Sequence, residues 1–180
     1  YIIVNDISFS RKLPKHKYKL GLEYWHYKWL ERDLQFVPKD HTIVICGHAQ
    51  LFRNFGGKGK DPDGKKNLSY ARYSKLLSQY ARVYSWSGHY HYNFGYDYAN
   101  STAEAHAPLK NITSICVART CGGLHCNRDL YNDGTPNGYM VMEVDGDNIE
   151  WYYKSIGHDR DYQMHVYAPA RTGGEFVKVN

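Results

Sequence analysis

The sequence predicts an α/β protein, α+β overall, in which strands and helices alternate first and short strands dominate later. Three observations support this class. Apolar strand-type runs alternate with two amphipathic helical segments up to about residue 92, an order typical of α/β folds. Shorter β-type segments and a hairpin signal follow. The 180 residues, 42% of them hydrophobic, suffice for one domain, or for one domain with a small appendage.

The chain begins with an apolar strand-type run, YIIV at residues 1–4, which Asn5-Asp6 closes. Residues 11–19 are basic, contain a proline and indicate a loop. Residues 20–37 have helical spacing, and Pro38 ends the helix. The predicted apolar side of this helix consists of Leu22, His26, Trp29, Leu30, Leu34 and Val37.

The next predicted strand is TIVIC at residues 42–46, a continuous apolar run of the kind buried on both faces of a sheet. Residues 53–67 are rich in Gly and Lys and indicate a loop. A second amphipathic helix is predicted over residues 68–81, and residues 83–86 form the following strand. The apolar side of that helix is expected to consist of Tyr70, Tyr73, Leu76, Leu77 and Tyr80.

The later half of the chain is predicted to be rich in β structure. Residues 93–111 are polar and irregular. Strand-type segments follow at residues 112–120, 139–144, 148–154, 163–167 and 174–179. Asp145-Gly146 is a hairpin-turn signal. A soft boundary near residue 155 gives two expected domains, 1–155 and 156–180.

Composition and charge narrow the function classes. The net charge is +5, and Lys gathers in residues 11–19 and 58–66. Such clusters are either solvated loops or contacts for phosphate-bearing partners. The sequence contains no nucleic-acid-binding signature, and it lacks an apolar run of about eighteen residues that would predict a membrane-spanning helix. The 18 Tyr and 4 Trp suit half-buried strands and partly aromatic clefts.

The four cysteines contain no Cys-x-x-C pair, which argues against a zinc knuckle. Cys46 and Cys116 lie in apolar strand-type runs and are predicted to be buried thiols. Cys121 and Cys126 lie in a Gly-rich loop, where they are either bridged or free.

Two predicted strands end in the same pattern, a strand followed by Gly and then His. His48 follows TIVIC through Gly47, and His89 follows VYSWS through Gly88. Open α/β sheets place their sites at the carboxyl ends of neighbouring strands, so these imidazoles are candidate metal ligands. His91 lies two residues beyond His89, and an extended backbone would turn the two rings apart. They would then serve two different metal ions.

With these residues the chain resembles the second half of a calcineurin-like metallophosphoesterase. Trp29-Leu30-Glu31, TIVICGHAQLF and VYSWSGHYHY carry the likeness. The family's late motifs, a strand-terminal His and Gly-His-x-His, fall on His48 and on His89 with His91. The resemblance implies the second half of a β-sandwich flanked by helices, followed by a small β-rich C-terminal region.

A narrower likeness points to a subgroup with an additional C-terminal β domain. It is carried by NDGTPNGY at residues 132–139, WYYK at 151–154 and YQM at 162–164.

The resemblance implies hydrolysis of phosphate mono- or diesters by a two-metal mechanism. His48 and His89 would ligate one divalent ion and His91 the other. Mn, Fe, Zn and Mg are not distinguished. The candidates for the substrate side of the site are Tyr90, Tyr92, Asn93 and His106.

The family's early motifs, an Asp-x-His, a Gly-Asp whose Asp bridges the metals and an Asn-His-Asp/Glu, are not found in this sequence. Gly146-Asp147 imitates one of them but lies in the predicted hairpin turn. We therefore expect a fragment of a phosphoesterase whose metal site is incomplete or empty, and little or no hydrolysis by this chain alone. The catalytic residues of the reaction are not assigned.

The alternative is a non-catalytic β-rich binding or scaffold module of the same origin, with Trp151, Tyr152 and Tyr153 as its aromatic contacts. Self-association through the β region and a secreted, periplasmic or cell-envelope location are further expectations.

Overall fold

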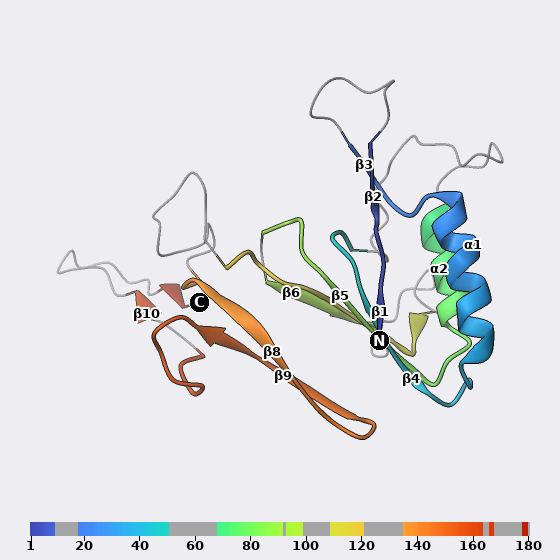
Figure 1. Ribbon diagram of the computed structural model, residues 1–180. Coiled ribbons are helices and arrows are strands. Elements are labelled where there is room, and N and C mark those ends of the chain that lie inside the picture. The colour runs from blue at the N-terminus through green and yellow to red at the C-terminus, as the bar shows by residue number, and fades with distance from the viewer. Residues whose placement is uncertain are drawn as a thin grey trace. The chain divides into compact units, whose positions relative to one another are not determined.

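The computed structural model describes most of the chain, and its elements mix helices with strands (Figure 1). This confirms the predicted α+β class. Two compact units are present: Tyr1–His89 with Asn93–Cys116, and Tyr90–Tyr92 with Val117–Asn180. The domain boundary near residue 155 and the β-sandwich stay predictions. The described residues are 1–9, 18–50, 68–91, 93–98, 109–120, 135–163, 166–167 and 178–179.

The first unit is built on a five-stranded sheet with the strand order β1-β4-β5-β7-β6. Strands β1, β4, β5 and β7 are parallel, and β6 pairs antiparallel with β7. Their bounds are β1 Ile2–Ile3, β4 Thr42–Cys46, β5 Arg82–Ser87, β6 Phe94–Asp97 and β7 Ile112–Cys116. All four parallel strands therefore end at the same edge of the sheet.

Two of these strands differ from the sequence prediction. β6 lies within residues 93–111, which were predicted to be irregular, so that prediction is wrong for Phe94–Asp97. Its backbone hydrogen bonds come from pairing with β7, which the local sequence pattern does not predict. β7 ends at Cys116, earlier than the predicted end at residue 120.

The helices α1 (Tyr24–Asp33) and α2 (Leu68–Leu77) lie side by side (Figure 1). The ring of Tyr27 on α1 meets the ring of Tyr73 on α2 edge-on, with centroids 6.0 Å apart. α1 continues as the short 3₁₀ helix η1 (Leu34–Phe36) before Pro38. The predicted helix starts too early, because Gly21 has a φ of 116° and Leu20 belongs to a strand.

The core of this unit forms where both helices face the sheet. Leu30 and Leu34, four residues apart, are fully buried, as periodicity predicts. Trp29 is 50% exposed, so its predicted place on the apolar side is wrong. The cluster of buried side chains consists of Ile2, Val4, Leu30, Leu34, Ile43, Ile45, Tyr73, Leu76, Leu77, Tyr80, Val83, Tyr98, Leu109 and Ile112.

A short ribbon follows β1. Strands β2 (Ile7–Ser8) and β3 (Lys19–Leu20) pair antiparallel. The Gly21 amide donates to the carbonyl of Asp6 at 2.8 Å, which ties the base of the ribbon to the end of β1.

In the second unit, β8 (Gly138–Asp145) and β9 (Asn148–Ser155) form a regular antiparallel hairpin. Asp145 pairs with Asn148, and Gly146 has a φ of 59°, which is the left-handed conformation that a two-residue hairpin turn requires. The predicted hairpin is confirmed. Two short strands, β10 (Val166–Tyr167) and β11 (Lys178–Val179), also pair antiparallel.

Candidate metal-binding site

The loops after β4 and β5 continue the pairing of their strands. Cys46 is the register partner of Trp86. Beyond them the Gly47 amide donates to the Trp86 carbonyl at 3.0 Å, and the Gly88 amide donates to the His48 carbonyl at 2.9 Å. His48 and His89 therefore leave the same edge of the sheet on adjacent, hydrogen-bonded backbones.

The two imidazoles are in contact. Nε2 of His48 lies 3.0 Å from Nδ1 of His89, and the ring centroids are 5.0 Å apart. One of the two nitrogens carries a proton and donates it to the lone pair of the other. The structure thus brings together the two residues that the sequence predicts as ligands of one metal ion.

The separation of these nitrogens fits joint coordination. Two imidazole donors at about 2.1 Å from one cation and at right angles to each other lie about 3.0 Å apart. Metal sites in proteins use four to eight ligands, so two imidazoles alone do not complete one. Among the residues that the structure describes, no group of three or more His, Cys, Asp and Glu side chains is placed to hold a metal ion.

The backbone conformation at His89 and His91 corrects one expectation. Their φ angles are 71° and 62°, so the backbone is left-handed at both residues and not extended. Non-glycine residues adopt this conformation at a cost and often at functional sites. The argument from strand alternation therefore does not apply, although His91 as ligand of a second metal stays a prediction.

The predicted substrate-side residues are not all described. Tyr90 and Asn93 are half-buried, whereas Tyr92 and His106 lie outside the described residues. A role in substrate binding stays a prediction for all four. Cys121 and Cys126 also lie outside the described part of the chain.

Sequence reasoning missed a ring that borders the histidine pair. Tyr18 meets the His89 ring edge-on, with centroids 6.2 Å apart, and it is 42% exposed. It lies at the end of the basic segment that was predicted to be a loop, so no local signal marked it. Only the β2–β3 ribbon brings it beside His89.

Asp6 and Cys116 were also missed as parts of the site. Asp6 was interpreted only as the end of the first strand, although a single acidic residue after an apolar run is a signal of its own. Its carboxylate accepts the backbone amides of His48 and Ala49. Cys116 is buried, as predicted, and its Sγ donates to the Gly88 carbonyl at 3.0 Å. Asp6 thus binds the loop after β4, and Cys116 binds the loop after β5.

Cys46 is half-buried, less than predicted. Burial raises the pKa of its thiol above the ordinary range. The group therefore stays protonated at neutral pH, which makes it a poor metal ligand and a weak nucleophile.

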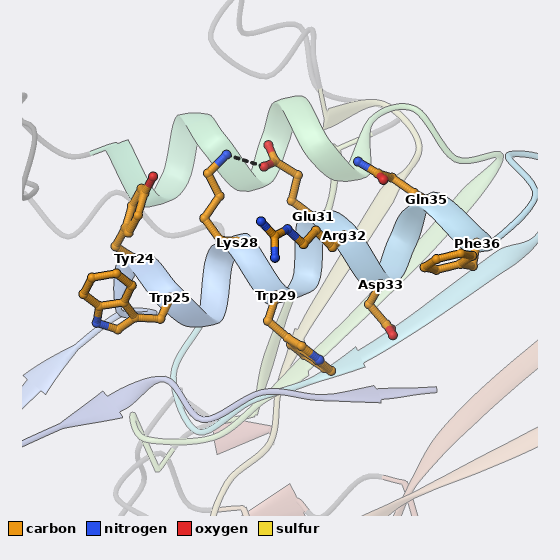
Figure 2. A pocket seen from close by; sticks show the side chains of 9 residues that line it. All are labelled: Tyr24, Trp25, Lys28, Trp29, Glu31, Arg32, Asp33, Gln35 and Phe36. Atoms are coloured by element: carbon orange, nitrogen blue, oxygen red, sulfur yellow. Dashed lines mark hydrogen bonds and ion pairs between the residues drawn. The ribbon is translucent and has the colours of Figure 1, made fainter.

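A hollow is lined by side chains of α1 and η1 (Figure 2). Trp25 and Trp29 project from the same side of the helix, and Phe36 on η1 is 88% exposed. Lys28 and Glu31 form an ion pair at 2.5 Å, and the hydrogen bond from Lys28 lowers the pKa of Glu31. The hollow combines aromatic rings with charges of both signs, and neither His48 nor His89 belongs to its lining.

The aromatic residues of the β8–β9 hairpin divide between its two faces. Trp151 is the register partner of Met142, Tyr152 of Val141 and Tyr153 of Met140. Successive residues of a strand point to opposite faces, so Tyr152 lies on the face away from Trp151 and Tyr153. The three consecutive rings do not form one continuous aromatic surface.

Residues 120–177 match the family model described as the C terminal of calcineurin-like phosphoesterase. The comparisons with curated proteins and with solved structures found no match. The matched residues include the β8–β9 hairpin and β10, and all of them belong to the second unit. The match therefore confirms the likeness in the late part of the chain, whereas the His48–His89 pair lies outside the matched residues.

Proposed function

Since residues 120–177 match the family model of the C-terminal region of calcineurin-like phosphoesterases, we propose that the chain is part of a metal-dependent phosphoesterase. The proposed reaction is hydrolysis of a phosphate mono- or diester. One observation carries this proposal: two imidazole nitrogens 3.0 Å apart at the carboxyl edge of a parallel sheet. The chemistry and spacing of these donors suit one divalent cation.

In this proposal Nε2 of His48 and Nδ1 of His89 hold the same ion. Both nitrogens must then present lone pairs, so the proton that they share moves to the far nitrogen of its ring. A divalent cation in such a site supplies positive charge that stabilises the developing charge on a phosphoryl group. His91 is proposed as the ligand of a second ion. The carboxylate ligands of the family belong to the early motifs, which are not found in this sequence.

The first test is cobalt binding by this chain and three single variants. Co²⁺ bound to imidazole absorbs in the visible range. We expect weak binding to the wild type and none to His48→Ala or His89→Ala. His41→Ala is the matched control, because His41 is exposed and precedes the other end of β4. Equal binding by the wild type and both ligand variants would refute the proposed site.

The second test is turnover of an aryl phosphate in the presence of Mn²⁺. A site that lacks its carboxylate ligands leaves the charge of two cations poorly compensated, so we expect little or no hydrolysis by this chain alone. Robust hydrolysis that is lost in His48→Ala would support the phosphoesterase but contradict the incomplete site. Cobalt binding without hydrolysis is the expected result.

A further inference from the structure

Among the residues that the structure describes, Asp6 is the one charged side chain that is buried. It follows β1 at the edge where the parallel strands end, and it is only 1% exposed. Burying a carboxylate costs several kcal/mol unless hydrogen bonds compensate its charge, and this cost is on the order of the whole free energy of unfolding of a small domain. The hydrogen-bond partners of Asp6 must therefore compensate the cost of burying its carboxylate.

Both carboxylate oxygens bind the loop that carries His48. Oδ1 accepts the His48 amide at 2.8 Å, and Oδ2 accepts the Ala49 amide at 2.5 Å. Hydrogen bonds to an ionised acceptor are short and strong, as these are. On its other side, the His48 carbonyl accepts the Gly88 amide. The peptide groups on both sides of the His48 Cα are thus held, and the imidazole is aimed at His89.

The loop fits closely around this carboxylate. A Cβ atom on Gly47 would lie 3.2 Å from Oδ2 of Asp6 and 3.1 Å from Cγ2 of Val4. Such contacts are tighter than most Cβ contacts, so a methyl group at this position would require the Asp6 carboxylate, the Val4 side chain or the loop to shift by a few tenths of an ångström. Glycine at position 47 therefore favours the close approach of the loop to Asp6, and its φ is not unusual.

We propose that Asp6 is a positioning residue of the site: its buried carboxylate holds the loop Gly47–Ala49 so that the His48 imidazole faces His89. This inference rests on the proposed function of the two histidines as ligands. Asp6 acts through two backbone amides, and no contact between its carboxylate and a metal ion is part of the proposal. A carboxylate is required because its two oxygens accept two donors at once.

The test uses the whole 180-residue chain, labelled with ¹⁵N and free of metal, with the substitution Asp6→Asn. The amide of Asn keeps one acceptor and turns a donor toward the other backbone amide. We expect the exchange protection of the His48 and Ala49 amides to fall by about tenfold or more, as for the loss of roughly one strong hydrogen bond. The ¹⁵N shifts that report the proton between the two rings should move toward those of independent imidazoles.

The matched control is Asp40→Asn, which makes the same chemical change at an exposed residue near the opposite end of β4. It should leave both readouts unchanged. If Asp6→Asn keeps the amide protection and the ring signals of the wild type, Asp6 is not a positioning residue. Amide protection of Val83 in β5 checks that the variants remain folded.

A second variant tests the same contact without changing a charge. Gly47→Ala pushes a methyl group toward Asp6 and Val4, so it should reproduce the loss of protection at His48 and Ala49. This variant decides the matter if Asp6→Asn does not fold. Wild-type protection of both amides in Gly47→Ala would overturn the inference.

Cobalt titration separates this inference from the proposed function. Loss of a residue that orients a metal ligand typically weakens metal binding by about 10- to 100-fold. We expect Asp6→Asn to weaken Co²⁺ binding by at least about tenfold, and Asp40→Asn to have no effect. Equal affinities for the wild type and Asp6→Asn, with binding lost in His48→Ala, would refute the role of Asp6 alone. Binding unaffected by His48→Ala would refute the metal site, and the metal-free spectra would still decide the role of Asp6 in placing His48.

Discussion

The hydroxyl group of Tyr80 joins the end of α1 to the loop before β4, and its removal should measurably destabilise the first unit. Tyr80 is 2% exposed, and its hydroxyl donates to the Leu34 carbonyl at 2.5 Å. Lys39 Nζ donates to the same oxygen at 2.6 Å. Tyr80→Phe deletes both hydrogen bonds and leaves the ring in place.

The expected loss of unfolding free energy is about 1–2 kcal/mol. A hydrogen bond typically contributes about 0.5–1.5 kcal/mol, and more with a charged partner. Two features keep the sum low. The Leu34 carbonyl still accepts the Val37 amide at 3.2 Å, and the exposed Lys39 ammonium regains water. For a chain of this size the loss corresponds to a decrease of roughly 2–8 °C in Tm.

Urea unfolding followed by Trp fluorescence measures this change, since Trp25, Trp29 and Trp86 lie in the first unit. Tyr1→Phe is the control, because Tyr1 is 82% exposed, and a surface change of this kind should cost no more than about 0.5 kcal/mol. A Tyr80→Phe variant as stable as Tyr1→Phe would refute the reasoning. It would mean that the hydroxyl makes no net contribution at this position.

Two further predictions concern the hairpin and a buried thiol. Gly138→Ala would bring its Cβ into overlap with the Lys154 carbonyl oxygen, so we expect the free energy of unfolding to fall by about 1–3 kcal/mol or more and amide exchange along β8 and β9 to become faster. Unchanged exchange would contradict the close packing. Burial raises the pKa of Cys46, so at pH 8 iodoacetamide should modify it more slowly in the folded chain than in urea, as mass spectrometry of the Cys46 peptide can show. The raised pKa also means that the protonated Cys46 thiol favours the folded state. The unfolded thiol loses its proton first, near pH 8.5, so this contribution to stability is complete below that pH and is lost as the pH rises through the higher pKa of the folded chain. Equal modification rates in the folded and unfolded chain would be the contrary result.

Much of the fold was predictable from local sequence patterns. The continuous apolar run at residues 42–46 is β4, and its three central residues are buried. Asp145-Gly146 marks the turn of the long hairpin, because glycine readily adopts the left-handed conformation found at Gly146. Strand β6 was not predictable, since an edge strand of four residues depends on its partner for its hydrogen bonds.

The sequence predicted which two histidines lie together, but it did not predict the residues that hold them in place. A strand followed by Gly and His occurs twice, and the parallel pairing of β4 with β5 brings His48 and His89 within hydrogen-bond distance. The left-handed backbone at His89 was not foreseen. Local periodicity treats residues after a strand as extended, whereas the chain bends at His89.

The sequence by itself determined which residues can form strands and helices, and it placed two imidazoles directly after two strands. These properties depend on neighbours within a few positions along the chain. Only the tertiary structure decided that Asp6, 42 residues before His48, would accept the amides of its loop, and that Tyr18 would border His89. The physical reason is that parallel strands bring residues distant in the sequence to a common edge of the sheet. A carboxylate buried at that edge requires hydrogen-bond donors, and the neighbouring loop supplies them. The histidines are visible in the sequence, and their arrangement is a property of the sheet.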